Sequence, residues 1–182
     1  EEKHGLKKRR EWRKLHLVID RNSQAIIAQE LTTSLKSDPA TVDTLLDQIT
    51  GEISSVTADG AYSTNEVYNS ITTHAVDDVV IAIPPQINSA LFSVNYMTEP
   101  TKRDHNILFA EKYGKYRWQD YSDYNYRSLV ETTMFRYKKI IGESLFSRNF
   151  NAQKIESKIA CHVLNKMTAL GMPVSEKVKA AA

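Results

Sequence analysis

Hydrophobic positions near the start of the sequence recur with the period of a β-strand. Residues 14–20 (KLHLVID) alternate apolar and polar side chains, and residues 25–32 (AIIAQELT) form a second run rich in strand-forming residues. Residues 20–23 (DRNS), which lie between them, are of the types that favour tight turns. This pattern predicts a β-hairpin.

The pattern after the hairpin predicts a β-α-β unit. Residues 37–39 (SDP) can open a short helix whose buried stripe ends near Ile49. A strand is expected over 53–58, followed by a helix over 64–72 that is capped by Ser63 or Thr64. Residues 79–83 form a continuous apolar run, which is typical of a buried parallel strand. A hairpin followed by β-α-β predicts an α/β protein with a mixed sheet.

The second half of the chain reads as helical after a long irregular stretch. Residues 86–123 are polar and aromatic, so we expect a long connection or insertion with some helix near 102–112. A strong helix is predicted over 124–141, with Gly142 placed to end it. A last helix is predicted over 151–170, with apolar positions Ile155, Ile159, Val163, Leu164 and Met167.

Composition narrows the class of protein. The chain has 182 residues, of which 41% are hydrophobic and 25% charged, as expected for one globular domain. Its single cysteine, Cys161, excludes an intramolecular disulfide and fits a reducing cytoplasm. No apolar run approaches the roughly 20 residues of a membrane span, and there is no signal-peptide core at the start. We therefore expect a soluble cytoplasmic protein that does not enter a membrane.

The formal charge of +2 conceals a basic cluster in the first sixteen residues. A segment of this kind is either a solvated stretch or a surface that binds phosphate groups. The cluster is opposed only by Glu1, Glu2 and Glu11, and its members are Lys3, Lys7, Lys8, Arg9, Arg10, Arg13 and Lys14.

Two acidic positions are candidates for chemistry. Asp59 follows a predicted buried strand, where α/β folds place functional groups, although an Asp-Gly pair there can also be a plain turn. At about 100° per residue, Tyr124, Arg127 and Lys138 fall within about 40° of Glu131 on one helical stripe. This stripe is either an exposed face with an Arg–Glu pair or a metal-binding carboxylate flanked by phosphate-binding groups.

The spacing Tyr124-x-x-Arg127-x-x-x-Glu131, followed by Lys138, resembles the signature around the last acid of DDE insertion-sequence transposases of bacteria. The likeness is greatest to the Insertion Sequence Five group. Further stretches resemble that group in the same order along the chain: HGLKKRREWRKLHLVID (4–20), ADGAYST (58–64), AIPP (82–85), RDHN (103–106), RSLVETTMFRYKKIIGESLFSR (127–148) and HVLNKMTALGMP (162–173).

This resemblance implies a ribonuclease-H-like fold, a five-stranded mixed sheet with flanking helices. Three carboxylates of such domains hold two Mg²⁺ ions, for which Mn²⁺ can substitute. Asp59 matches the second acid and Glu131 the third. The first acid and the first strand are expected upstream of residue 1, so residues 1–182 form a partial catalytic domain. Asp20 ends a strand that carries no catalytic acid in the family, and it is expected to be a turn residue.

The implied reaction is metal-dependent hydrolysis of phosphodiester bonds at transposon ends, followed by strand transfer into target DNA. Without the first acid, this chain alone is expected to cleave DNA little or not at all. The family acts as multimers on double-stranded DNA, so a homo-oligomer is expected for the full-length protein, in the cytoplasm and on the nucleoid when bound to DNA.

The resemblance also implies DNA contacts. Arg127 and Lys138 are expected to contact phosphates of the scissile strand. Tyr124 either contacts a sugar or phosphate or packs within its helix. Trp118 either stacks on an exposed base or fills the core. The segment Lys7–Lys14 is expected to follow the DNA backbone.

Two other functions remain open on the sequence. The chain is alternatively a DNA-binding remnant of a transposase that has lost its chemistry. A nuclease relative that acts on RNA would instead cleave RNA–DNA hybrids without preferring transposon ends.

Overall fold

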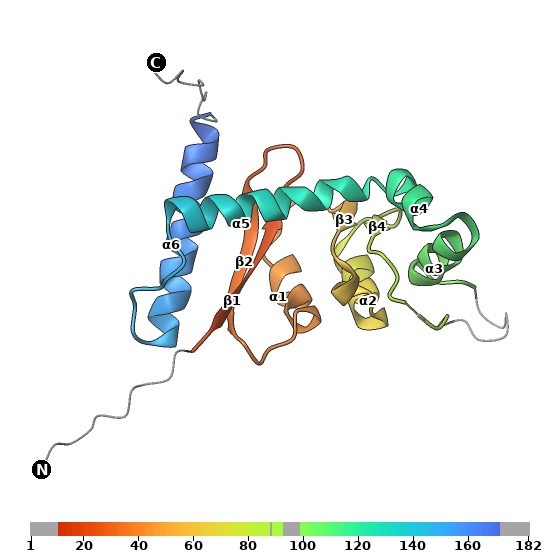
Figure 1. Ribbon diagram of the computed structural model, residues 1–182, viewed down its shortest axis with the longest axis horizontal. Helices are drawn as coiled ribbons and strands as arrows, with labels where there is room; N and C mark the ends of the chain where they lie inside the picture. The colour runs from red at the N-terminus through yellow and green to blue at the C-terminus, as the bar shows by residue number, and fades with distance from the viewer. Residues whose placement is uncertain (1–10, 88, 93–98, 172–182) are drawn as a thin grey trace, which may run out of the picture.

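The computed structural model describes residues 11–87, 89–92 and 99–171. These residues form a mixed α/β fold (Figure 1). In chain order its elements, with η for 3-10 helices, are β1 (Arg13–Ile19), β2 (Ile26–Thr33), η1 (Pro39–Thr41), α1 (Val42–Leu46), β3 (Ser55–Thr57), η2 (Gly60–Tyr62), α2 (Asn65–His74), β4 (Val80–Ala82), α3 (Lys102–Tyr113), α4 (Lys115–Tyr121), η4 (Tyr124–Arg127), α5 (Ser128–Ile140) and α6 (Phe150–Ala169).

The predicted hairpin is confirmed. Strands β1 and β2 pair antiparallel, with Leu17 opposite Gln29, and the register shifts at a bulge after Val18. Asp20 forms the turn, because its Oδ2 accepts the N–H of Ser23 at 2.7 Å and the Ser23 hydroxyl at 2.6 Å. These hydrogen bonds stabilise the carboxylate and lower the pKa of Asp20. Asp20 is therefore a turn residue, as expected.

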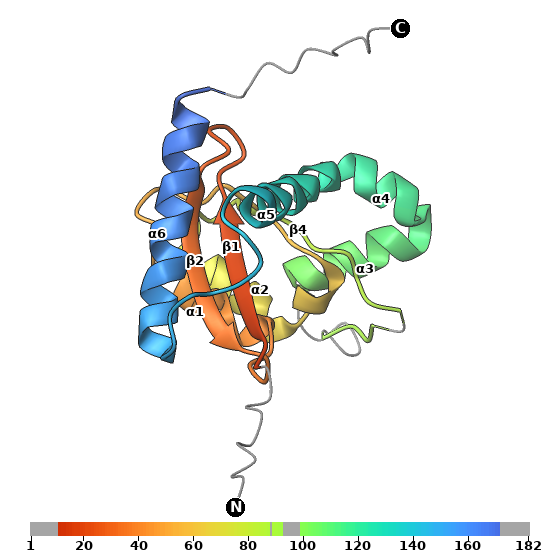
Figure 2. The ribbon, with the colours of Figure 1, turned by 60° about the vertical axis from the view of Figure 1, so that its left-hand side comes forward.

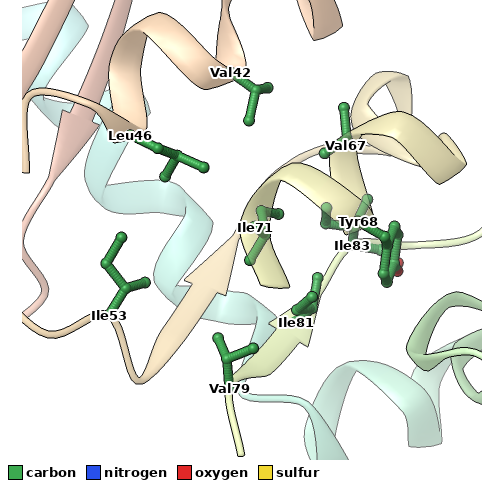
Figure 3. Close-up of a cluster of buried hydrophobic side chains, with 9 residues drawn as sticks. All are labelled: Val42, Leu46, Ile53, Val67, Tyr68, Ile71, Val79, Ile81 and Ile83. Atoms are coloured by element: carbon green, nitrogen blue, oxygen red, sulfur yellow. The ribbon is translucent and has the colours of Figure 1, made fainter. Parts of the chain in front are cut away.

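The predicted β-α-β unit is also confirmed. Strands β3 and β4 pair in parallel, with Val56 opposite Ile81. Thr64 caps α2, since its hydroxyl accepts the N–H of Val67 at 3.3 Å. A core of apolar side chains fills the space between the strands, α1 and α2 (Figure 3), and consists of Val42, Leu46, Ile53, Val67, Tyr68, Ile71, Val79, Ile81 and Ile83.

The expectation of one mixed sheet is not met in the described residues. Their four strands form two separate two-stranded sheets, β1-β2 and β3-β4. In Figure 1, helix α5 lies across both sheets. The turn η4, which precedes α5, contacts β3, and α5 itself contacts β1. In the described residues, the two sheets are not joined by hydrogen bonds between strands.

The stretch 86–123 is more regular than its sequence indicates. Besides the expected helix near 102–112, which is α3, it contains the unpredicted helix α4. A capping box opens α3, in which Thr101 and Asp104 exchange hydrogen bonds. Gly114 joins the two helices with a φ of +85°, a conformation that glycine adopts without strain. The described parts of this stretch are therefore largely a helical hairpin.

Helix α6 packs against the outer side of β2 (Figure 2), but not through the expected residues. Its buried residues are Ser157, Ala160, Cys161 and Leu164. Of the predicted apolar positions, only Leu164 is buried; Ile155 and Ile159 are 61% and 57% exposed. Small side chains let the helix approach the strand closely, so its large apolar side chains are left on the outer face.

The predicted helix over 124–141 begins as a 3-10 turn. Tyr124 and Arg127 lie in η4, and the α-helix α5 starts only at Ser128. Gly142, with a φ of +119°, follows its end and donates its N–H to the carbonyl of Tyr137, as expected of a helix-terminating glycine. Within the described residues, no helix has the length and hydropathy needed to cross a membrane.

Candidate functional site

Asp59 lies immediately after β3, where the chain turns into η2. Its Oδ1 accepts the N–H of Ala61 at 2.9 Å and so caps this short helix. Its Oδ2 has no hydrogen-bond partner among the described residues. Gly60 brings the backbone against Pro84, because a Cβ on Gly60 would lie 3.4 Å from the Pro84 carbonyl oxygen. The carboxylate is thus oriented by its own turn and keeps one oxygen available.

Glu131 lies in the first turn of α5 and forms an ion pair with Arg127, four residues earlier. Both side chains are partly open to solvent, with exposed fractions of 60% and 36%. Such a pair contributes only a few tenths of a kcal/mol. The pair is the one expected for a solvated helix face, and it also places a guanidinium beside the carboxylate.

Tyr124 is the residue to which both acids are close. Burial raises the pKa of Tyr124, the charge of Arg127 lowers it, and the charges of Asp59 and Glu131 raise it further. Coulomb interactions weaken with distance, so both carboxylates lie within electrostatic range of this phenol. Contact between β3 and η4 brings them together. The two acids, 72 positions apart in sequence (131 minus 59), therefore lie in the same region of the molecule, and both line one cleft.

A second tyrosine stands beside Asp59. Burial raises the pKa of Tyr62 to about 12, and the charges of Asp38 and Asp59 add to the increase. Its hydroxyl therefore stays protonated at neutral pH and can donate a hydrogen bond at the site. Tyr62 lies within the ADGAY motif, but no feature of the sequence indicated that its hydroxyl stands beside Asp59.

The two acids line a cleft of about 1750 Å³ between the two sheets. Lys138 also lines this cleft and has no ion-pair partner in the described part of the chain. Among these described residues, no group of three or more histidine, cysteine, aspartate or glutamate side chains is placed to hold a metal ion. The site offers two carboxylates and a free ammonium group, but not a three-acid cluster.

Trp118 is fully packed within the protein. It is 1% exposed, its Nε1 donates to Asn106 Oδ1 at 2.9 Å, and its ring lies 5.3 Å from that of Tyr124. Neither ring face is open to a base, so the structure favours the core-filling alternative over base stacking. The ring of Trp118 packs against the ring of Tyr124. Asn106 lies within the RDHN motif, but no feature of that motif indicates its contact with Trp118.

The basic segment is described only in part. Lys7, Lys8, Arg9 and Arg10 lie outside the described residues. The Arg13 side chain pairs with Glu11 at 2.7 Å and stacks over the ring of Phe150, and Lys14 pairs with Asp38 at 2.9 Å. Arg13 and Lys14 are therefore engaged within the protein.

The tip of the hairpin is held against the start of η4, which no sequence motif indicated. The Arg21 guanidinium carbon lies 3.3 Å from the ring centre of Tyr126, and its Nη2 is 3.3 Å from Asp123 Oδ2. Asp123 adopts a left-handed conformation, with a φ of +55°. This contact joins β1-β2 to the segment that positions Tyr124, Arg127 and Glu131.

The fold and this site together define an α/β domain in which two acids, one directly after a parallel strand and one on a helix, line the same cleft. A family model for the transposase DDE domain matches residues 1–166. The chain therefore belongs to the transposase DDE domain family. Members of this family act in DNA transposition, bind DNA and generally use divalent metal ions. No solved structure matches the chain.

Proposed function

We propose that this chain is the catalytic part of an insertion-sequence transposase of the Insertion Sequence Five group, with a ribonuclease-H-like fold. Its reaction is hydrolysis of phosphodiester bonds at transposon ends, followed by strand transfer into target DNA. The observation that supports the proposal is that Asp59, Glu131 and Lys138 line one cleft, beside the contact between β3 and η4. Each of these residues also occupies a matching position in the family signature.

In this proposal Asp59 and Glu131 bind divalent metal ions. Carboxylate oxygens are hard ligands that suit Mg²⁺, and Mn²⁺ should substitute. Oδ2 of Asp59 has no other partner among the described residues, and Glu131 exchanges its Arg127 contact for a cation. When bound, the ions activate the attacking oxygen and stabilise the departing one. The donor set therefore fits such ions as two of the three expected acids.

The first acid of the family is proposed to lie on a strand upstream of the 4–20 segment, as the family resemblance implies. With two acids, the 182-residue chain is expected to bind a divalent ion weakly and to cleave DNA little or not at all.

The same site is proposed to hold double-stranded DNA. Lys138 lines the cleft without an ion-pair partner in the described residues and supplies a positive charge for a phosphate. Arg127 becomes available as a phosphate ligand when Glu131 binds metal. Tyr124 can donate its hydroxyl to the same backbone. The segment Lys7–Arg10 is proposed to follow the DNA backbone, with salt-dependent affinity, in a homo-oligomer that brings two transposon ends together.

Metal binding by the intact 182-residue chain tests the central claim. Mn²⁺ binding can be followed by the loss of the free-ion electron paramagnetic resonance signal. Asp59→Asn and Glu131→Gln are each expected to weaken Mn²⁺ binding by at least about tenfold, because each removes one charged ligand. Asp78→Asn, in an exposed acid between α2 and β4, is the matched control. Equal Mn²⁺ affinity in all three variants and the parent chain would refute the proposed site.

A DNA-binding remnant without chemistry is the second candidate, and the missing three-acid cluster favours it. The two candidates differ in how DNA affinity responds to metal. A remnant binds a labelled duplex equally with and without Mn²⁺, and Glu131→Gln leaves that affinity unchanged. A metal-dependent site gains affinity with Mn²⁺ and loses the gain in Glu131→Gln. Lys138→Ala weakens duplex binding in both cases and lowers its dependence on salt.

A further inference from the structure

The turn that carries Asp59 is too short to keep its shape alone. Element η2 spans three residues and is closed by two backbone hydrogen bonds, from Tyr62 N–H to the Asp59 carbonyl at 3.1 Å and from Ser63 N–H to the Gly60 carbonyl at 3.2 Å. A 3-10 turn of this length has poor hydrogen-bond geometry, and ordering its backbone costs more free energy than so few bonds contribute. The place of the Asp59 carboxylate therefore depends on groups that hold the turn from outside.

Gln86 holds the start of this turn. Its Nε2 donates to the Gly60 carbonyl at 2.9 Å, across 26 positions of the sequence. The same segment approaches the turn at a second point, because a Cβ on Gly60 would lie 3.4 Å from the Pro84 carbonyl oxygen. Pro84 and Pro85 end the AIPP motif directly before Gln86, and their fixed φ angles limit the positions that Gln86 can take. Gln86 thus fastens the turn to the segment after β4.

Arg103 holds the end of the turn. It lies in the first turn of α3 and is the first residue of the RDHN motif. Its Nε donates to the Ser63 carbonyl at 3.2 Å, and its Nη1 donates to the Ala90 carbonyl at 3.0 Å. The planar guanidinium presents these donors in a fixed geometry, and hydrogen bonds from a charged donor are stronger than neutral ones. Arg103 thus links the end of the turn to α3.

The two contacts enclose the residue that orients the Asp59 carboxylate. Asp59 Oδ1 accepts the N–H of Ala61 at 2.9 Å, and Ala61 lies between Gly60 and Ser63 in the chain. A shift of either carbonyl moves Ala61, and the hydrogen bond that orients the carboxylate moves with it. Both outer side chains bond to the backbone and not to the carboxylate, so they act on Asp59 through the turn.

We propose that Gln86 and Arg103 are positioning residues for Asp59, whose carboxylate they hold in place by fixing both ends of its turn. The inference rests on the proposed function, in which Asp59 binds a divalent ion. A metal ligand has to stay within roughly 0.5 Å of its productive position. The inference also gives a role to the RDHN motif and to the residue after AIPP, to which the sequence assigns none.

Hydrogen exchange of the intact 182-residue chain, without metal, tests the positioning directly. Gln86→Met and Arg103→Met keep long side chains that cannot donate a hydrogen bond. Each is expected to speed exchange of the Ala61 and Tyr62 amides by at least about fivefold, because the turn opens more often. Arg103→Lys keeps a charged donor and is expected to restore part of the protection that Arg103→Met loses.

Gln48→Met is the matched control for these variants. The Gln48 side chain is also exposed, and its Nε2 also donates to a backbone carbonyl, that of Gln29 at 3.1 Å. The variant therefore loses a comparable hydrogen bond on β2 but none at the turn. It is expected to leave the exchange of the Ala61 and Tyr62 amides at the parent rate.

Mn²⁺ binding shows whether the held carboxylate serves the metal site. The loss of supporting hydrogen bonds lowers metal affinity, and a decrease of at least about threefold is expected in Gln86→Met and in Arg103→Met. Gln48→Met should keep the parent affinity. In an Asp59→Asn background, the first two changes should lower Mn²⁺ affinity no further, because the charged ligand that they position is already gone.

Several results would overturn the inference. Parent-like exchange of Ala61 and Tyr62 in both variants does so, as does equal acceleration in Gln48→Met. An undiminished Mn²⁺ affinity, or a decrease of the same size in the Asp59→Asn background, also does so. Failure of the proposed function gives a different result, in which the parent chain and Asp59→Asn bind Mn²⁺ equally or not at all. The exchange rates alone then support or overturn the positioning of Asp59.

Discussion

Asn106 is the residue whose replacement should most directly reveal how the site is supported. Its Nδ2 donates to the Tyr68 hydroxyl and to the Ile81 carbonyl, both at 2.8 Å, and its Oδ1 accepts the indole N–H of Trp118 at 2.9 Å. It therefore links β4 and α2 to the tryptophan that packs against Tyr124. Leucine has nearly the same shape but can make none of these hydrogen bonds.

The cost of Asn106→Leu follows from the groups that it leaves unpaired. The Trp118 indole N–H and the Ile81 carbonyl both lie in residues that are less than a tenth exposed. An unpaired buried polar group costs roughly 1–3 kcal/mol, whereas the Tyr68 hydroxyl keeps its bond to Ile83. We expect the free energy of unfolding to fall by about 3 kcal/mol, a large part of the stability of a domain.

A double-mutant cycle distinguishes this account from a general loss of packing. Trp118→Phe removes the indole N–H and should cost about 2 kcal/mol, mostly through the smaller ring. In the double variant no indole N–H is left unpaired, so the combined cost should be about 1 kcal/mol less than the sum. Urea unfolding followed by far-ultraviolet circular dichroism measures all four proteins.

Asn151→Leu serves as the control, because Asn151 is exposed on α6 and makes no side-chain hydrogen bond among the described residues. Its free energy of unfolding should change by less than about 0.5 kcal/mol. Costs of Asn106→Leu and Trp118→Phe that simply add, or an Asn106→Leu cost no greater than the control, would refute the reasoning.

Three further predictions concern titration, reactivity and an unpaired hydroxyl. Burial lowers the pKa of His16 below its usual 6.5, so its imidazole binds a proton more readily in the unfolded chain than in the folded one. The free energy of unfolding therefore falls as the pH decreases below about 6.5. Below pH 6.5, the free energy of unfolding of the parent chain should fall more steeply with decreasing pH than that of His16→Asn. His74, whose pKa is raised, changes the stability of both proteins equally and does so above pH 6.5, so it does not affect the comparison. Burial raises the pKa of the Cys161 thiol to about 11, so iodoacetamide should label the native chain far more slowly than the urea-unfolded chain. Equal labelling rates would contradict the packing of α6. The buried hydroxyl of Ser63 has no hydrogen-bond partner in the described residues. Ser63→Ala should therefore raise the free energy of unfolding by up to about 1 kcal/mol, and with it the melting temperature; a lower melting temperature would contradict this.

Local signals account for the parts of the fold that could be predicted. The turn at Asp20, the cap at Thr64 and the terminating Gly142 each act through hydrogen bonds to residues within five positions. Such interactions depend on the residue types and spacing alone. The hairpin, the parallel unit and the helix α5 were therefore readable from the sequence to within a few residues.

The candidate site was predictable only as two separate motifs. The sequence marked Asp59 by its strand and Glu131 by its spacing to Arg127 and Lys138. Their common approach to Tyr124 depends on contact between β3 and η4, which no local pattern encodes. The sequence left two roles possible for Trp118, base stacking and core filling, because an aromatic side chain in an irregular stretch has the same sequence signal whether it is buried or exposed.

The sequence by itself determined the order and type of most elements and the transposase family, since these depend on periodicity and motif spacing. Tertiary structure alone decided which face of α6 is buried, because a helix with small residues on one side can approach β2 more closely than its larger side chains allow. It also decided which backbone groups at the strand edges receive hydrogen bonds from distant side chains. Those edges depend on which distant side chains, such as Gln48, Asn106 and Asn165, reach the backbone.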